Sequence, residues 1–412
     1  MKTQNLPNNI RVLSLETPSF NLERIYNDNL IETQGIEEKV KLLLVRDLFR
    51  LNWNIEKSED KLIVSPPIYY DKEIIRQSMS VLRQEILCKN REWIEKHIDL
   101  AKKNLAQGKD ILKSEISPRI EVCKTQKQHD LFRIFRYYWS SPYSEYVGRR
   151  IRIIIRDDGI DGSPIIGIAA LGSSIIHIPD RDRWIGWDKE TRTNNIIYTM
   201  DAYVLGALPP YNYLLGGKLI SYILASNEVR EIYKEKYKRK KTIIRMRQAD
   251  DWVCTFTTSL YGNGSQYNRL KFKNKLLYIP IGFTSGYGTL HISNETFLAM
   301  QQFLMEKDAM ETNRFGDGPN WRMRVIRLSS DLIGFDSNIL LKHSFRRGIY
   351  AVPLAKNFRS FLLGKTKKPI YYNLPMKKLV KFWKERWLNM RKKNVDVINK
   401  VLQFGPEDFR IY

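Results

Sequence analysis

A dense group of hydroxyl and amide side chains follows a predicted strand at residues 255–259. In the stretch TTSLYGNGSQYNRL (residues 257–270), the glycines and Asn263 predict a turn, but turn formation alone does not require the run of polar residues 266–269. Polar groups at the end of a strand are well placed to line a substrate pocket. We therefore predict a pocket formed by Ser259, Tyr261, Tyr267 and Asn268.

One acidic residue, Asp201, lies on an otherwise apolar predicted strand at residues 198–207. Such a carboxylate is either a general base or the buried partner of an arginine. Asp157, Asp158 and Asp161 also cluster, but in a DDGIDGSP turn where aspartate and glycine are expected for backbone reasons. Asp201 therefore completes the predicted catalytic set.

Several familiar kinds of site have no sequence signature in this chain. The three cysteines are widely spaced without a CxxC pair, and the five histidines form no HxxxH or HxH motif. We expect reduced cysteines and no metal site. The absence of GxxxxGK[ST] excludes a P-loop motor. No cofactor is assigned, and no cofactor-binding residue is predicted.

The most unusual property of the composition is its positive net charge. Lys and Arg number 69 against 45 Asp and Glu, which gives a net charge of +24. Such a balance predicts a polyanionic partner, and we expect nucleic acid, DNA in particular. No apolar stretch of about twenty residues occurs, and the first residues lack a signal-peptide pattern. We therefore expect a cytoplasmic protein without a membrane partner.

Two basic runs carry much of this charge. Residues 365–393 contain eleven basic residues and one acidic residue, and residues 230–247 contain nine basic residues and two glutamates. Trp383 and Trp387 are four apart on one helix, so we expect them to pack inward while the lysines face phosphates. The predicted nucleic-acid-binding residues are Arg149, Arg150, Arg183, Trp187, Arg269, Arg314, Arg322, Arg346, Arg347, Lys377, Lys378 and Lys381.

Two further stretches leave alternatives open. In PDRDRWIGWD (residues 179–188), alternating acids and arginines form either a closed salt network or a base-recognition loop in which tryptophan stacks. In ALPPYNYLLGGKLISYIL (residues 207–224), Gly216 and Gly217 precede a helix. They either cradle a phosphate or let the helix pack closely on a sheet. Leu214 and Leu215 fill the turn, so we expect a scaffold role for Gly216.

The pattern of elements predicts an α+β fold in three parts. An N-terminal mixed and helical domain spans residues 1–125, an α/β domain spans 126–293, and a basic helical region spans 294–412. Two apolar strands at 152–156 and 165–171 flank an Asp/Gly turn and predict a hairpin. Ser293 is the expected N-cap of the helix that follows it.

The order of the central elements is similar to the layout of GNAT acyltransferases: strand, turn, strand, a strand entering a glycine turn and helix, and two later strands. In that fold the turn before the central helix binds the pyrophosphate of acyl-CoA. The usual Gln/Arg-x-x-Gly-x-Gly/Ala loop does not match YNYLLGGK at residues 211–218.

A closer resemblance covers residues 126–412. The strings RYYWSSPYSEYVGRRIR, GIAALGSSIIHIPDRDRWIGWD, TTSLYGNGSQYNRL, NRFGDGPNWRMRVIR and HSFRRGIYAVPLA resemble the DruA family of the Druantia anti-phage defence system. The resemblance implies bacterial antiviral defence, other Druantia subunits and a large helicase-like partner. Three hypotheses follow: an enzyme acting on nucleic acid through a GNAT-like pocket, a non-catalytic DNA-recognition module that loads the helicase, and an acyl-CoA-dependent acyltransferase.

Overall fold

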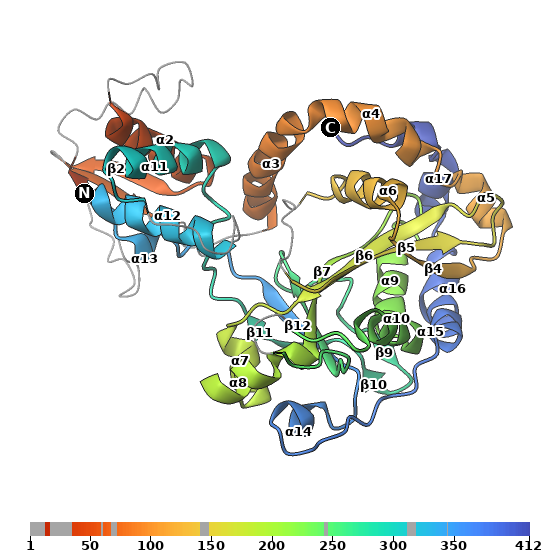
Figure 1. The fold of residues 1–412 in the computed structure, drawn as a ribbon. Helices are drawn as coiled ribbons and strands as arrows, with labels where there is room; N and C mark the ends of the chain where they lie inside the picture. The colour runs from red at the N-terminus through yellow and green to blue at the C-terminus, as the bar shows by residue number, and fades with distance from the viewer. Residues whose placement is uncertain are drawn as a thin grey trace, which may run out of the picture. The chain divides into compact units, whose positions relative to one another are not determined.

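The computed structural model describes residues 13–16, 35–58, 61–66, 72–140, 148–242, 246–310, 319–343 and 345–412 (Figure 1). The chain forms two compact units. The first combines Met1–Glu85 with Ser285–Arg346, and the second combines Ile86–Thr284 with Arg347–Tyr412. These boundaries do not coincide with those expected near residues 125 and 293, and the three-part division stays a prediction.

The second unit contains a seven-stranded mixed sheet. In spatial order its strands are β11 (Ile279–Phe283), β12 (Gly348–Pro353), β8 (Cys254–Ser259), β7 (Thr199–Ala207), β6 (Ile165–Ser173), β5 (Arg150–Asp157) and β4 (Pro118–Val122). The predicted hairpin is confirmed, because β5 and β6 pair antiparallel. Within this sheet β7 and β8 run parallel, and their pairing extends only from Thr199↔Cys254 to Ala202↔Thr257.

Helices cover both faces of this sheet, which is why its central strands are apolar throughout. Along β5, Ile153 and Ile155 enter one core and Ile154 enters another, as the two-residue period of a strand requires. The first core contains α9 (Gly216–Leu224), α10 (Asn227–Tyr237), α15 (Met376–Trp383) and α17 (Val395–Gln403). The second contains α4 (Arg91–Lys102) and α6 (Gln126–Arg136), which lie on the opposite side of the strands in Figure 1.

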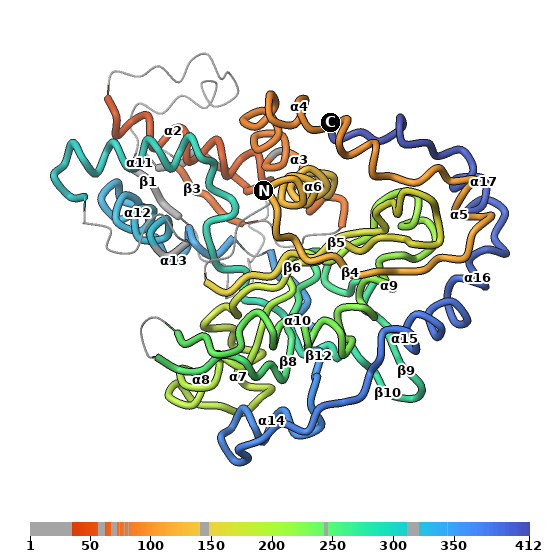
Figure 2. Tube along the Cα trace, turned by 45° about the vertical axis from the view of Figure 1, so that its right-hand side comes forward, coloured from red at the N-terminus to blue at the C-terminus, as the bar shows by residue number. Residues whose placement is uncertain are grey.

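Further elements belong wholly or partly to the second unit. They are α3 (Lys72–Lys89), which crosses the boundary between the units, α5 (Gly108–Lys113), α7 (Pro179–Ile185), α8 (Lys189–Asn195), the β9–β10 hairpin (Lys271–Phe272 and Lys275–Leu276), α14 (Phe358–Leu362) and α16 (Asn389–Arg391). Three separate helices, α3, α4 and α5, thus follow one another between residues 72 and 113. The tube view in Figure 2 shows β9 and β10 beside α15, as Figure 1 also does.

The first unit is a small α+β assembly built from two distant segments of the chain. Its sheet has the order β1 (Leu13–Glu16), β3 (Lys61–Ser65), β2 (Asn54–Ser58), and its helices are α2 (Ile36–Arg50), α11 (Asn294–Glu306), α12 (Pro319–Leu332) and α13 (Ser337–Leu340). Buried Asp47 of α2 accepts the Ser293 N–H at 2.7 Å and the Thr296 hydroxyl at 2.6 Å. Ser293 caps α11 as predicted. The expected α+β class is confirmed for the chain.

Among the described helices, none is both long and apolar enough to cross a membrane. In the same part of the chain, no group of three or more His, Cys, Asp or Glu side chains is arranged to hold a metal ion. Cys88, Cys123 and Cys254 are free thiols.

Candidate functional site

The predicted catalytic residues lie on two different faces of the sheet. Asp201 is opposite Phe256 in the register of β7 and β8, and Phe256 lies against the Arg181 guanidinium. Side chains alternate along β8, so Ser259 points to the other face. Tyr267 packs on that other face, against Tyr350 at 5.0 Å between ring centroids. The structure therefore does not bring Asp201 together with the remaining predicted residues.

On the Tyr267 face, the predicted residues bond to the chain itself. The Tyr350 hydroxyl donates to Asn268 Oδ1 at 2.8 Å and accepts the Gly264 N–H at 3.1 Å. Tyr261 Oη lies 3.0 Å from Ser140 Oγ. Burial raises the pKa of Tyr267 to about 12, which makes it a poor proton donor near neutral pH. These contacts fix the conformation of residues 259–270.

Asp201 is buried and lies within the electrostatic influence of Arg181, while its role as a general base or as an arginine's partner stays a prediction. Its Oδ2 accepts the Ile175 N–H at 3.0 Å, and Arg181 is its main favourable charge. Burial nevertheless raises the pKa of Asp201 to about 6, because the Arg181 charge and the Ile175 and Ser174 hydrogen bonds only partly offset desolvation. Its Oδ1 is also buried and has no hydrogen-bond partner.

The stretch PDRDRWIGWD (residues 179–188) forms a closed salt network, which is one of the two alternatives stated for it. Asp182 accepts from Arg181 at 2.7 Å, from Arg192 at 2.9 Å and from the Trp187 indole at 3.0 Å. Burial works to raise the pKa of Asp182, but the Arg181 charge and these hydrogen bonds outweigh it and lower that pKa. Trp187 is buried, so neither face of its ring is presented to solvent.

The glycine turn is filled by the chain's own side chains where acyl-CoA would bind in a GNAT protein. Gln266 Nε2 donates to Leu205 O and to Ser221 Oγ, both at 3.0 Å, and the same side chain lies over Gly217. The Gln266 side chain thus lies where β7 and β8 are no longer paired. The Lys218 ammonium donates to the carbonyl oxygens of Ser265 at 2.6 Å and Gln266 at 3.3 Å.

Burial lowers the pKa of Lys218 to about 8, and the Arg269 charge adds to the effect. This ammonium and the Gln266 amide hold the 265–268 loop against α9. The Gly216 N–H is itself bonded to Tyr211 O at 2.9 Å. A turn in which the Gly216 N–H is already bonded and the Gln266 side chain lies over Gly217 does not fit a pyrophosphate, and the residues present do not fit acyl-CoA.

Gly216→Ala is expected to destabilise the protein by about 1–2 kcal/mol, the usual cost of overpacking. A Cβ at this position would lie 2.7 Å from Tyr211 O and 2.8 Å from the Ala207 side chain, which is closer than packed atoms tolerate. Urea unfolding followed by circular dichroism measures the change. Gly35→Ala is the control, because a Cβ there meets no atom within 4 Å. Equal effects of the two substitutions would contradict the packing role.

The predicted nucleic-acid-binding residues divide into packed and exposed ones. Arg149 bonds to the Tyr233 hydroxyl and, at 3.2 Å, to Thr199 O, and Arg322 of the first unit bonds to Ile292 O at 2.7 Å. Arg347 is half-buried. Arg314 lies outside the described residues. The exposed members are Arg150, Arg183, Arg269, Arg346, Lys377, Lys378 and Lys381.

A basic surface forms where the β9–β10 hairpin meets α15. Phe272 of the hairpin contacts Phe382 of α15 edge to face at 5.4 Å, and the Lys275 ammonium lies 3.2 Å from the centre of the Tyr372 ring. Lys378 precedes Phe382 by one helical turn and therefore shares its side of α15. We call this the hairpin–helix surface, and its exposed basic residues are Arg269, Lys271, Lys273, Lys275, Lys377, Lys378, Lys381 and Arg386.

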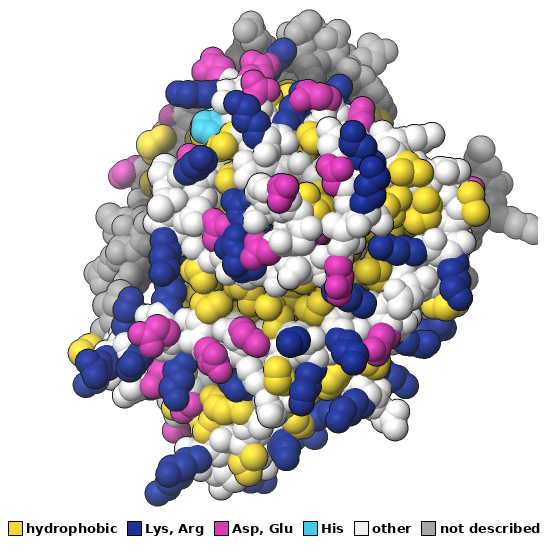
Figure 3. All heavy atoms as spheres, turned by 90° about the vertical axis from the view of Figure 1, so that its right-hand side faces the viewer, with side chains coloured by type: hydrophobic (Ala, Val, Ile, Leu, Met, Phe, Trp, Pro, Cys, Tyr) yellow, Lys and Arg dark blue, Asp and Glu magenta, His cyan; other side chains and the backbone are white. Residues whose placement is uncertain are grey.

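Sequence reasoning found the helix half of this surface but missed the hairpin half. Lys271, Lys273 and Lys275 alternate in KFKNK, a pattern that places three cations on one short hairpin. Figure 3 views the side of the molecule on which α15 and α17 lie in Figure 1, and Lys and Arg side chains, with Asp and Glu side chains among them, surround an apolar band there. Trp383 is buried beneath this surface, as predicted, and its indole donates to Leu215 O at 3.2 Å.

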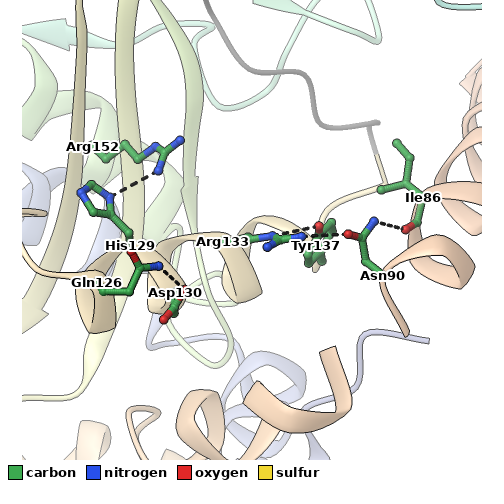
Figure 4. Close-up of a pocket in the computed structure, with 8 residues that line it drawn as sticks. All are labelled: Ile86, Asn90, Gln126, His129, Asp130, Arg133, Tyr137 and Arg152. Atoms are coloured by element: carbon green, nitrogen blue, oxygen red, sulfur yellow. Dashed lines mark hydrogen bonds between the residues drawn. The ribbon is translucent and has the colours of Figure 1, made fainter. Parts of the chain in front are cut away.

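A polar pocket of about 440 Å³ lies between α6 and the α3–α4 junction. Its lining residues are Ile86, Asn90, Gln126, His129, Asp130, Arg133, Tyr137 and Arg152 (Figure 4). Arg133 donates to Asn90 Oδ1 at 2.8 Å and lies 4.0 Å from the centre of the Trp93 ring. Arg152 is 3.3 Å from His129 Nδ1. These mutual bonds fix α6 to its neighbours, and we assign the pocket no ligand.

The fold and the surface together define an α+β protein with a mixed central sheet and a basic hairpin–helix surface. The family model described as Druantia protein DruA matches residues 70–364. The Druantia protein DruA of Escherichia coli (strain UMEA 4076-1) is 34% identical over 322 residues, which cover 77% of this chain and 79% of that protein. No solved structure matches.

The chain therefore belongs to the DruA family. It is a DruA-family anti-phage defence protein of the Druantia type, as the resemblance predicted. Membership in this system implies that it works with other Druantia subunits.

Proposed function

We propose that the chain binds DNA through the hairpin–helix surface and serves its defence system as a nucleic-acid-recognition module. One observation carries this proposal: two segments about a hundred residues apart place their cations side by side. Residues 269–276 and 376–384 contain no Asp or Glu. Lys381 pairs with Glu385 at 3.9 Å and Lys384 with Glu115 at 2.6 Å, whereas no acidic partner is found among the described residues for Lys271, Lys273, Lys377 or Lys378. Cations that track a phosphate backbone release counterions on binding, which supplies affinity without sequence preference.

The proposal favours a binding role over catalysis because the predicted catalytic residues are dispersed. Asp201 bonds to the Ile175 N–H on one face of the sheet, while Tyr267 and Asn268 bond within their own loop on the other. A helicase-like Druantia subunit, implied by the resemblance, would then supply the motor that this chain lacks. Any chemistry on the nucleic acid would also belong to a partner.

We also propose that the central sheet is a GNAT-like scaffold adapted to this role. The parallel pairing of β7 with β8, and their connection through a glycine turn into α9 and α10, support the likeness. The Gln266 side chain then occupies the cofactor region of such a scaffold and makes it rigid. Helix α9, which packs on the sheet, positions the hairpin, because the Tyr222 hydroxyl donates to Lys271 O at 2.6 Å.

The test replaces Lys271, Lys273, Lys377 and Lys378 together by alanine. We expect this variant to bind a 30-base-pair duplex about tenfold or more weakly at roughly 0.15 M salt, with a salt slope smaller by about four, one per lost phosphate contact. The loss should be equal for unrelated sequences. Fluorescence anisotropy over a salt series measures both quantities.

The matched control replaces four exposed lysines in the same unit, three on α3, α4 and α5 and one directly after α4: Lys89, Lys96, Lys109 and Lys103. It removes the same charge and should leave the salt slope nearly unchanged. If both variants lost DNA affinity and salt slope equally, the effect would come from net charge alone. That result would contradict a localised DNA-binding surface. Intact-mass analysis of the oligonucleotide after incubation should show no change, and a mass shift would support the enzymatic alternative instead.

A further inference from the structure

The loop between β6 and α7 presents two consecutive large apolar side chains to solvent. Ile175 is 48% exposed and Ile176 is 64% exposed, and the exposed His177 follows them, whereas Ser174 and Ile178 on either side of these three residues are buried. Single exposed apolar residues are common on protein surfaces. Two adjacent isoleucines at the tip of a loop in a strongly basic protein need a further reason.

The backbone that carries these isoleucines is held by buried charged groups. Arg181, which is fully buried, donates to Ile175 O at 2.6 Å and to Ile176 O at 3.1 Å. Asp201 accepts the Ile175 N–H at 3.0 Å from the opposite side of the peptide. Burying an arginine and a carboxylate is costly unless both are paired. Here both anchor the loop, so the two isoleucines are presented in a fixed position.

The sheet end behind this loop is basic. Ser174 accepts the Thr199 hydroxyl at 2.9 Å, and Thr199 O accepts from Arg149, so the loop is tied to the Arg149–Arg150 segment. The Lys236 ammonium donates to Arg150 O at 2.7 Å. The Arg149 N–H donates to Ser173 Oγ at 3.0 Å, so these cations lie at the end of β6 from which the loop begins. Burial lowers the pKa of Lys236, and the charges of Lys240 and Arg150 lower it further.

We propose that Ile175 and Ile176 form an apolar wedge that inserts between base steps of DNA bound at this basic sheet end. Nucleic-acid-binding proteins that unstack bases use isoleucine, leucine or phenylalanine wedges flanked by cations that hold the phosphates. A protein partner would be expected to bury a larger apolar area with fewer cations around it. The proposal rests on the proposed DNA binding and adds a second contact, through residues outside the hairpin–helix surface, with a local deformation of the duplex.

The experiment uses the full chain and a duplex with 2-aminopurine at a TA step, because pyrimidine–purine steps unstack most easily. We expect binding of the natural protein to raise 2-aminopurine fluorescence several-fold. In the Ile175→Ser, Ile176→Ser double variant this rise should fall to a third or less. The salt slope of binding should be unchanged, because no phosphate contact is lost.

The control is the Met390→Ser, Leu402→Ser double variant, which removes two exposed apolar side chains of the same unit. It should keep the full fluorescence rise. A natural protein that binds the duplex without any rise, or an isoleucine variant that keeps the full rise, would overturn the wedge. Loss of Druantia-subunit binding in the isoleucine variant with the rise intact would do so as well. A natural protein that does not bind DNA at all would instead contradict the proposed function.

Discussion

Arg181→Leu is expected to lower the free energy of unfolding by about 3–5 kcal/mol, the usual cost of removing one partner of a buried ion pair. Arg181 is fully buried and satisfies Asp182 together with the carbonyl oxygens of Ile175 and Ile176. Leucine fills part of the volume but leaves these acceptors without their main donor. Urea unfolding followed by circular dichroism measures the loss.

Arg183→Leu provides the matched control two residues further along α7. The Arg183 side chain is 77% exposed and pairs with Asp180 at 3.2 Å across one helical turn. Exposed pairs of this kind contribute at most about 1 kcal/mol. A loss for Arg181→Leu no larger than that for Arg183→Leu would show that the network around Asp182 does not stabilise the fold.

Asp201→Asn is expected to change the pH dependence of stability. The folded pKa of Asp201 is about 6, above its ordinary value of 3.8, because burial outweighs the Arg181 charge. The folded state therefore binds more protons than the unfolded state between these values, and stability falls as pH rises through them. Between pH 4 and pH 8 this fall is on the order of 2 kcal/mol. Asparagine cannot titrate, so the variant should lack this fall in stability.

The measurement is the difference in free energy of unfolding between the natural protein and Asp201→Asn at pH 4, 6 and 8. The natural protein should lose stability relative to the variant as the pH rises. A constant difference would mean that Asp201 keeps its ordinary pKa. The same variant also addresses catalysis. If Asp201 only positions the loop between β6 and α7, anti-phage protection should survive in Asp201→Asn, because the asparagine oxygen still accepts the Ile175 N–H.

Local sequence patterns predicted much of the fold. The β5–β6 hairpin follows from two apolar runs around an Asp/Gly turn, and the Ser293 cap follows from a serine before a helical pattern. The inward packing of Trp383 follows from helical spacing in a basic run. Each of these depends on neighbours within about a dozen residues.

The candidate site was less predictable because it depends on long-range register. Period-two alternation indicates that Asp201 and Ala202 face opposite ways, but only the pairing of β7 with β8 places Asp201 beside Phe256 and away from Tyr267. Likewise, no local pattern relates Phe272 to Phe382, so the hairpin half of the basic surface emerged only from packing. The packing of residues 285–346 with residues 1–85 in one unit also depends on contacts between distant parts of the chain, which no local pattern predicts.

The central claim is that DNA contacts the hairpin–helix surface, and lysine footprinting tests it most directly. The full chain is acetylated with and without a saturating duplex, and each lysine is quantified by mass spectrometry. We expect DNA to protect Lys271, Lys273, Lys377 and Lys378, and to leave Lys89, Lys96, Lys103 and Lys109 as reactive as in the free protein. Protection of the second group with the first unprotected would contradict the account.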